Sequence, residues 1–206
     1  MLARFGGRLR VAVSGGAPIA EPVIRLFLSL GLDVLQGYGM TETSPAVLVL
    51  DREDAARKAG SAGKPVLHTE VRIVRPDGSD ADVGELGELW VKGPNITPGY
   101  WNRPEANKTS FTDGWLHTGD KVTQDAEGCV RITGRVKDLF KTSKGKYVAP
   151  APIEDRLGMN PAIEACCVAG ANMGQPLGIA MLSPQGLQRA SSEAERAALM
   201  AELSRH

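Results

Sequence analysis

The chain has 206 residues with 24 basic and 24 acidic side chains, so its formal net charge near neutral pH is zero. Hydrophobic residues make up 42% and charged residues 23%, which is ordinary for one globular domain or two small ones. A zero net charge gives no electrostatic reason to expect nucleic acid or an anionic membrane as a partner. The apolar run Val47–Leu50 is far shorter than the ~20 residues that span a bilayer, so we expect no transmembrane segment.

The cysteines indicate a reducing environment. There are three of them, Cys129 and the adjacent Cys166 and Cys167. An odd number with a neighbouring pair is a poor basis for a disulfide framework, which favours a cytoplasmic location. We interpret Cys166 and Cys167 as small residues of a buried strand.

The first part of the chain predicts a β-α-β unit. Leu9–Val13 and Leu32–Gln36 are short apolar runs typical of strands, and Pro22–Leu30 has apolar residues at helical spacing. The two strands are therefore expected to be parallel. In such sheets ligands bind beyond the carboxyl ends of the strands, which is where the turn Ser14–Pro18 lies.

Residues 60–133 show a different pattern of short alternating runs separated by turns. Val71–Val74, Glu88–Lys92 and Cys129–Ile132 predict strands of a small antiparallel sheet or barrel. A boundary follows at Gly134–Asp138. The chain is therefore expected to combine α/β and β structure, with an α/β sheet of parallel strands before about Gly60 and a small antiparallel sheet or barrel in residues 60–133.

The third part predicts two helices and a strand. A short helix is expected from Ile153, and a strand over Ala165–Ala169. Ser192 is placed to cap the last helix, with Glu195 three residues later as its capping-box partner.

The segment Gln36–Glu42 combines side chains that suit a nucleotide phosphate with its magnesium ion. Its two glycines allow the backbone to approach a ligand closely, and Tyr38 offers a flat face for a purine. Thr41 is a hydrogen-bond donor, and Glu42 supplies a hard oxygen ligand. The same residues also fit a tight turn after a strand, with Thr41 as a helix N-cap and Glu42 in the first helical turn.

Four separated segments together resemble the ordered signature of the adenylate-forming enzymes, a superfamily that holds acyl-CoA synthetases, firefly luciferases and the adenylation domains of peptide synthetases. The segments are Ser14–Ile19, Gln36–Glu42, Gly114–Asp120 and Gly134–Val148. The resemblance extends from about Val11 to Leu182. The last segment, continued through Pro150–Glu154, most resembles the long-chain fatty acyl-CoA synthetase branch.

The resemblance implies an ATP-dependent acid–thiol ligase that forms AMP. A fatty acid carboxylate would attack the α-phosphate of ATP to give an acyl-adenylate, and the thiol of coenzyme A would then displace AMP. The implied cofactors are ATP or AMP, Mg²⁺ and coenzyme A. The family places residues 1–59 at the end of the α/β part of its large nucleotide-binding domain and residues 60–134 in an antiparallel β-barrel. Residues 135–206 then form the hinge and the start of a small α+β C-terminal domain.

The implied nucleotide site takes its residues from separate turns. Tyr38 would stack on adenine, and the two oxygens of Asp120 would accept hydrogen bonds from the ribose hydroxyls, so these two residues are expected to meet around one adenosine. Thr41 and Glu42 are the expected catalytic residues, with Thr41 on the α-phosphate and Glu42 on the metal. The implied nucleotide-binding set in this region is Gly16, Ala17, Pro18, Gln36, Gly37, Tyr38, Gly39, Met40, Thr41 and Asp120.

Plainer interpretations of the same residues stay open. Tyr38 also fits a packed core tyrosine, and Asp120 beside Gly119 fits an Asx turn.

Three basic residues complete the implied site. Arg135 would reach the ribose or phosphate edge, where its forked guanidinium suits pairs of oxygens. Lys137 falls at the position of the family's hinge residue, and Lys141 lies on the loop that moves toward the active site for the thioester step. From charge alone, Lys137–Lys146 is an ordinary solvated loop.

Two family elements are missing from their expected places, the upstream phosphate-gripping loop and a lysine near the end of the C-terminal domain. No lysine follows Lys146. We therefore expect an internal piece of a longer ligase that is inactive alone and prone to self-association, because its sheet edge lacks partners. The alternatives are a non-catalytic nucleotide-binding or interaction module derived from such an enzyme, an aryl-CoA ligase, a peptide-synthetase adenylation domain, and a plain β scaffold.

Overall fold

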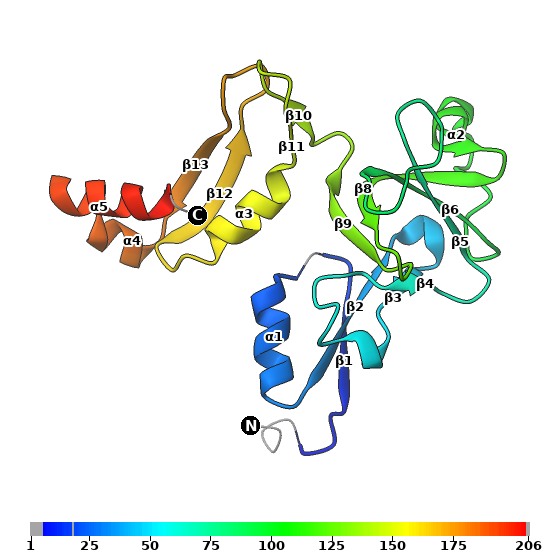
Figure 1. The fold of residues 1–206 in the computed structure, drawn as a ribbon, viewed down its shortest axis with the longest axis horizontal. Helices are drawn as coiled ribbons and strands as arrows, with labels where there is room; N and C mark the ends of the chain where they lie inside the picture. Colours follow the sequence, from blue (N-terminus) through cyan, green and yellow to red (C-terminus); the bar gives the residue numbers. More distant parts are fainter. Residues whose placement is uncertain (1–5, 18, 205–206) are drawn as a thin grey trace. The chain divides into compact units, whose positions relative to one another are not determined.

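The computed structural model describes residues 6–17 and 19–204 and forms two compact units, Met1–Ile132 and Thr133–His206 (Figure 1). The expected fold class is confirmed, because an α/β sheet and an antiparallel β sheet are followed by an α+β unit. The three-part division at residues 59 and 134 stays a prediction. Within the described residues, no helix has the length and apolar character needed to cross a bilayer.

The expected β-α-β unit is present. Strands β1 (Val11–Ser14) and β2 (Asp33–Gly39) pair in parallel, and helix α1 (Glu21–Ser29) lies alongside them (Figure 1). Gly31, with φ of +79°, adopts the left-handed conformation just after the helix ends. Apolar side chains of α1, of β2 and of two connecting segments form a small buried cluster of Ile24, Leu32, Val34 and Ala59.

The sheet then continues with antiparallel strands that the sequence analysis did not place. The short 3₁₀ helix η2 (Thr41–Thr43) leads into β3 (Ala46–Val49), which pairs antiparallel with β2. After a second 3₁₀ turn, η3 (Arg52–Asp54), the strand β4 (Lys64–Pro65) pairs with β3. The sheet is therefore mixed, with the order β1-β2-β3-β4.

The expected antiparallel part is a five-stranded sheet. Its central path runs β5 (Glu70–Val74), β6 (Gly87–Lys92), β8 (Trp115–Gln124) and β7 (Phe111–Thr112). Strand β9 (Val130–Arg135) pairs with β8, and the short helix α2 (Pro104–Ser110) precedes β7.

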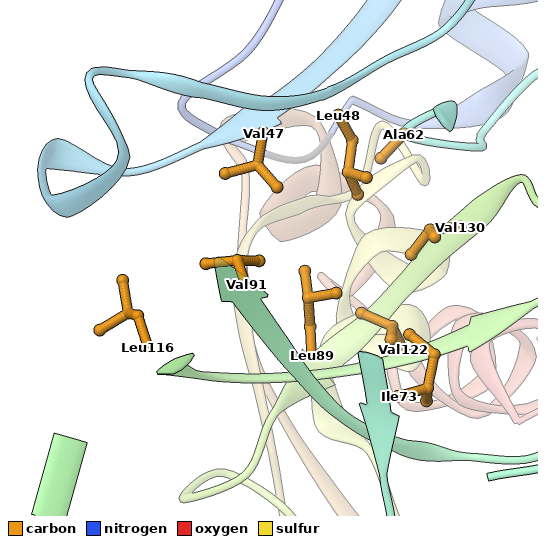
Figure 2. Packing of buried hydrophobic residues seen from close by; sticks show 9 residues of the cluster. All are labelled: Val47, Leu48, Ala62, Ile73, Leu89, Val91, Leu116, Val122 and Val130. Atoms are coloured by element: carbon orange, nitrogen blue, oxygen red, sulfur yellow. The ribbon is translucent and has the colours of Figure 1, made fainter. Parts of the chain in front are cut away.

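The two sheets of the first unit share one hydrophobic core. Figure 2 shows Val47 and Leu48 of β3 on one side of it and Leu89 and Val91 of β6 on the other. All four of these side chains are fully buried. The complete cluster is Val47, Leu48, Ala62, Ile73, Leu89, Val91, Leu116, Val122 and Val130. This common core fixes the end of β2, next to β3, relative to β8.

The second unit is built around the antiparallel pair β12 (Ile163–Ala169) and β13 (Leu177–Leu182), with helix α3 (Pro150–Gly158) packed on β12. A small hairpin of β10 (Phe140–Lys141) and β11 (Tyr147–Val148) precedes α3. Helices α4 (Pro184–Arg189) and α5 (Glu193–Leu203) follow β13. The predicted cap of the last helix is confirmed, because Ser192 Oγ accepts from Glu195 N at 3.3 Å and donates to the Glu195 carboxylate at 2.8 Å.

Two details of the second unit differ from expectation. Helix α3 starts at Pro150 rather than Ile153, because proline is well suited to the first helical turn, where its missing N–H is no loss. The strand that holds Cys166 and Cys167 is present, but the expectation that both are buried is wrong. Cys167 is exposed and Cys166 is half-buried, because α3 does not cover both faces of β12.

A cluster of charged side chains ties the segment after η3 to the turn between β8 and β9. The carboxylate of Glu127 accepts from Arg57 at 2.6 Å and lies 2.7 Å from the Lys58 ammonium. Lys58 also contacts Asp125 at 2.5 Å. Hydrogen bonds from Arg57 and Lys58 lower the pKa of Glu127 from 4.5 to about 2.

This cluster predicts a specific loss of stability in acid. A carboxylate whose pKa is lower in the folded than in the unfolded state stabilises the fold fully above its unfolded value, and that contribution is lost as the pH falls from about 4.5 to about 2. The urea midpoint should therefore drop less between pH 6 and pH 3 in Glu127→Gln than in the wild type. Glu105→Gln is the control, since that carboxylate is 83% exposed and pairs with its helix neighbour Lys108. Equal drops in wild type and Glu127→Gln would contradict the prediction.

Candidate functional site

The first two sequence motifs meet at the carboxyl ends of β1 and β2. Ser14 lies opposite Gln36 in the parallel register, so the turns that follow start at the same edge of the sheet. A Cβ on Gly15 would lie 3.2 Å from the Gly37 carbonyl oxygen, which only a glycine tolerates well. The next residue, Gly16, has φ of +80° and faces open space.

The remaining small residues of these turns differ in what surrounds them. Ala17 is exposed, and the predicted site residue Pro18 lies outside the described residues. A Cβ on Gly39 would lie 1.5 Å from the Pro45 carbonyl oxygen, so this glycine is required by the chain folding back on itself. Gly37 has only ordinary contacts, with Val13 and Leu48.

The third motif is joined to the second by a direct side-chain contact. The hydroxyl of Tyr38 on β2 donates a hydrogen bond to Oδ2 of Asp120 on β8, across 82 positions of sequence. Asp120 is only 5% exposed, and Tyr38 packs on the common core. The expectation that these two residues lie together is confirmed, whereas their roles toward a nucleotide stay predictions.

The backbone around Asp120 explains how its side chain is presented. Thr118 Oγ1 donates to the Leu89 carbonyl at 2.7 Å and accepts from Asp120 N at 3.1 Å. Gly119 has φ of +72°, and its N–H bonds Glu88 Oε1 at 3.0 Å, where the β6–β8 register shifts. The irregularity is a bulge that redirects the following side chain.

Next to Tyr38, the side chain of Gln36 carries an unsatisfied acceptor. Its Oε1 is buried and has no hydrogen-bond partner within the described part of the chain. Such a buried acceptor normally finds a donor in a ligand or an ordered water. It therefore marks the middle of β2, two residues before Tyr38, as a place where a polar ligand group fits.

Thr41 and Glu42 lie in the 3₁₀ turn η2. The residue before this turn is Met40, so the alternative in which Thr41 is the N-cap is wrong, although Glu42 does occupy the first turn. Thr41 is exposed. The fully buried Thr43 shapes the turn, because its Oγ1 accepts from Met40 N at 3.0 Å and lies 2.7 Å from the Pro45 carbonyl oxygen.

Glu42 has partners that the sequence analysis did not predict. Its Oε1 accepts a 2.8 Å hydrogen bond from the hydroxyl of Tyr100, and its carbonyl accepts from Thr97 N at 2.8 Å. Burial, together with the bond to Glu42, raises the pKa of Tyr100. No pattern in the single sequence links Tyr100 to a residue 58 positions earlier.

The role of Glu42 as a metal ligand stays a prediction. Among the described residues, no group of three or more histidine, cysteine, aspartate or glutamate side chains gathers around one point. Magnesium in nucleotide sites is commonly held by one or two carboxylates together with phosphates and waters. One well-placed glutamate is therefore a donor set that suits a nucleotide-bound magnesium ion.

The other predicted site residues belong to the second unit. Arg135 lines a cavity of about 420 Å³ together with Asp138, Glu154 and apolar residues of β10, α3 and β12. Lys137 is exposed, and Lys141 Nζ lies 5.4 Å from the ring centre of Tyr147. Their roles stay predictions.

Comparisons with known proteins agree with these motifs. A family model described as "AMP-binding enzyme" matches residues 2–101. A feruloyl-CoA synthase from Amycolatopsis is 46% identical over 162 residues, which is 79% of this chain and 33% of that protein. A long-chain-fatty-acid–CoA ligase from Haemophilus influenzae is 40% identical over 163 residues, 79% of this chain and 29% of that protein.

Solved structures of CoA synthetases also match this chain. The o-succinylbenzoate CoA synthetase of Bacillus subtilis in complex with an acyl-adenylate matches with a TM-score of 0.79 and 34% identity, over 91% of this chain and 41% of that one. The same enzyme with ATP and magnesium ion matches with a TM-score of 0.76 and 37% identity, over 88% and 39%.

The chain belongs to the adenylate-forming superfamily. It spans about a third of the length of the curated relatives it matches. Those relatives are named for feruloyl, indoleacetate, long-chain fatty acid and succinylbenzoate substrates, so the CoA-ligase class is common to them while the acid is not.

The contact between Tyr38 and Asp120 predicts a measurable stability effect. Tyr38→Phe keeps the ring but removes the donor to a largely buried carboxylate, so the free energy of unfolding should fall by about 1–3 kcal/mol. Urea denaturation followed by circular dichroism measures it. Tyr147→Phe is the control, because that side chain is 69% exposed and should change stability little. A Tyr38→Phe variant as stable as wild type would argue against the contact.

Proposed function

We propose that this chain forms part of the nucleotide site of an ATP-dependent acid–thiol ligase that makes an acyl-adenylate and then a coenzyme A thioester. The observation that carries the proposal is the Tyr38–Asp120 contact, which joins two of the motifs into one site. The superfamily membership supports it, and so do the ligands named for the Bacillus subtilis structures.

The residues present fit an adenosine phosphate. The open backbone at Gly16, in the turn after β1, leaves room for a flat base. On the neighbouring strand β2, the buried Gln36 oxygen needs a donor. Tyr38 offers its ring face, and Asp120 offers carboxylate oxygens to the ribose hydroxyls. Exposed Thr41 would donate to the α-phosphate, whose charge changes during attack.

Glu42 would hold the magnesium ion. When bound, the ion would neutralise charge on the phosphates and polarise the reacting one. The protein's own part is to hold the Glu42 carboxylate in a fixed orientation. In the second unit, Arg135 is proposed to reach the nucleotide, Lys137 to act at the hinge, and Lys141 to meet coenzyme A or AMP phosphate.

We propose a carboxylic acid with a large apolar tail as the substrate. The resemblance of residues 134–154 favours a long-chain fatty acid, whereas the 46% identity to a feruloyl-CoA synthase favours an aryl acid. A cytoplasmic location is proposed from the free cysteines. The non-catalytic alternative is a module that binds AMP without chemistry.

AMP binding tests the site directly. Titration calorimetry should detect weak binding to the wild type, and Asp120→Asn should weaken it about tenfold or more, because it removes a charged acceptor for ribose hydroxyls. Asp113→Asn is a suitable control, since Asp113 lies in the turn before β8 with φ of +51°, a conformation that asparagine tolerates. Equal AMP affinity of Asp120→Asn and wild type would exclude the proposed site.

Catalysis by the 206-residue chain is a separate matter. ATP–pyrophosphate exchange should be absent with either a fatty or an aryl acid, because no lysine follows Lys146 to supply the ammonium that the resemblance implies for adenylation. Exchange above a no-enzyme control would show that this lysine is not needed.

A further inference from the structure

The loop between β6 and α2 holds the turn that carries Thr41 and Glu42. Asn95 Nδ2 donates to the Thr43 carbonyl at 3.1 Å and to the Ala46 carbonyl at 3.0 Å. Two residues later, Thr97 N donates to the Glu42 carbonyl at 2.8 Å. The loop therefore holds the backbone at Glu42 and at two points after it, from positions 49 to 55 residues away in sequence.

Tyr100, at the end of this loop, contacts the side chain itself. Its hydroxyl donates to Glu42 Oε1 at 2.8 Å from a half-buried position. Within the described residues no lysine, arginine or histidine forms an ion pair with Glu42, and Oε2 has no protein donor. The phenol therefore orients the carboxylate without neutralising it, whereas a lysine in its place would compete with any cation for the same charge.

Tyr100 is in turn held rigidly. Asn107 of α2 bonds both sides of its backbone, accepting from Tyr100 N at 2.7 Å and donating to the Tyr100 carbonyl at 3.0 Å. The Tyr100 ring meets Phe111 edge to face, with the ring centres 6.1 Å apart. A Cβ on the preceding Gly99 would lie 3.1 Å from Asn107 Oδ1, so the glycine leaves room for Asn107 to bond the Tyr100 backbone this closely.

We propose that Tyr100 is a positioning residue, which fixes the Glu42 carboxylate so that its second oxygen is presented to the divalent cation of a bound nucleotide. The inference rests on the proposed function, because it takes Glu42 as the metal ligand. It adds a residue outside the four recognised motifs, and it assigns α2 the task of supporting that residue. Outer partners of metal ligands typically change metal affinity 10–100-fold when they are removed.

The first experiment measures metal affinity rather than activity. Mn²⁺ serves as the probe, and the enhancement of the water-proton relaxation rate reports the Mn²⁺–ATP complex bound to the chain, with Mn²⁺–ATP in the absence of protein as the baseline. Tyr100→Phe, which keeps the ring against Phe111, should weaken Mn²⁺ binding about tenfold or more relative to the wild type. ATP binding measured in excess chelator should not change. Tyr147→Phe is the matched control and should bind Mn²⁺ as the wild type does.

The second experiment needs no ligand. The chain has three tyrosines, so phenol ionisation can be followed by absorbance and assigned with single Tyr→Phe variants. The pKa of Tyr100 is raised by burial and by Glu42, so it should fall in Glu42→Gln, which removes the negative charge. An unchanged Tyr100 titration in Glu42→Gln would show that the two side chains do not interact, and would overturn the inference.

The two experiments separate the possible failures. Wild-type affinity for Mn²⁺ in a folded Tyr100→Phe variant would overturn the positioning role. If the wild type binds no Mn²⁺ with ATP, the proposed function fails and the metal-directed role with it, even where the titration confirms the contact. If Tyr100→Phe does not fold, the titration of wild type against Glu42→Gln decides.

Discussion

The hydrogen bond from Tyr38 to Asp120 is the contact on which the candidate site depends. It joins β2 of the mixed sheet to β8 of the antiparallel sheet, and so brings two of the motifs into contact. The contact is possible because β3 and β6 bury Val47, Leu48, Leu89 and Val91 in one core. The free energy that holds the site in place is therefore mostly hydrophobic burial, while the polar contact fixes its geometry.

Not every glycine of the recognised motifs is there to leave room for a ligand. Gly39 lies so close to the Pro45 carbonyl that any side chain would collide with the backbone, and Gly63 has the same relation to Val49. Both let β3 pass close to its neighbours. Gly16, in contrast, faces open space, which is where a bound group has room. Close backbone packing therefore explains why Gly39 is a glycine, whereas room for a ligand explains Gly16.

The sequence predicted well what depends on local pattern, and poorly what depends on distant partners. Hydrophobic periodicity and turn residues predicted β1, α1, β2, β5 and β6. The order of the motifs predicted that Tyr38 and Asp120 lie together. Strand β3 was missed, because a four-residue apolar run has no period of its own. Tyr100 and Asn95 were missed because their importance comes from bonds to the Thr41–Ala46 turn, and a single sequence holds no record of such pairings.

The electrostatics of the proposed site favour a cation between the protein and the phosphates. A chain of zero net charge exerts no long-range attraction on a polyphosphate, so affinity must come from local contacts. By itself, the Glu42 carboxylate would weaken nucleotide binding, because it repels the negatively charged phosphates. The repulsion becomes attraction only when a divalent cation lies between them, and it does so most effectively when the carboxylate is held in one orientation. A neutral phenol donor such as Tyr100 meets this condition, and because it carries no positive charge it does not compete with the metal.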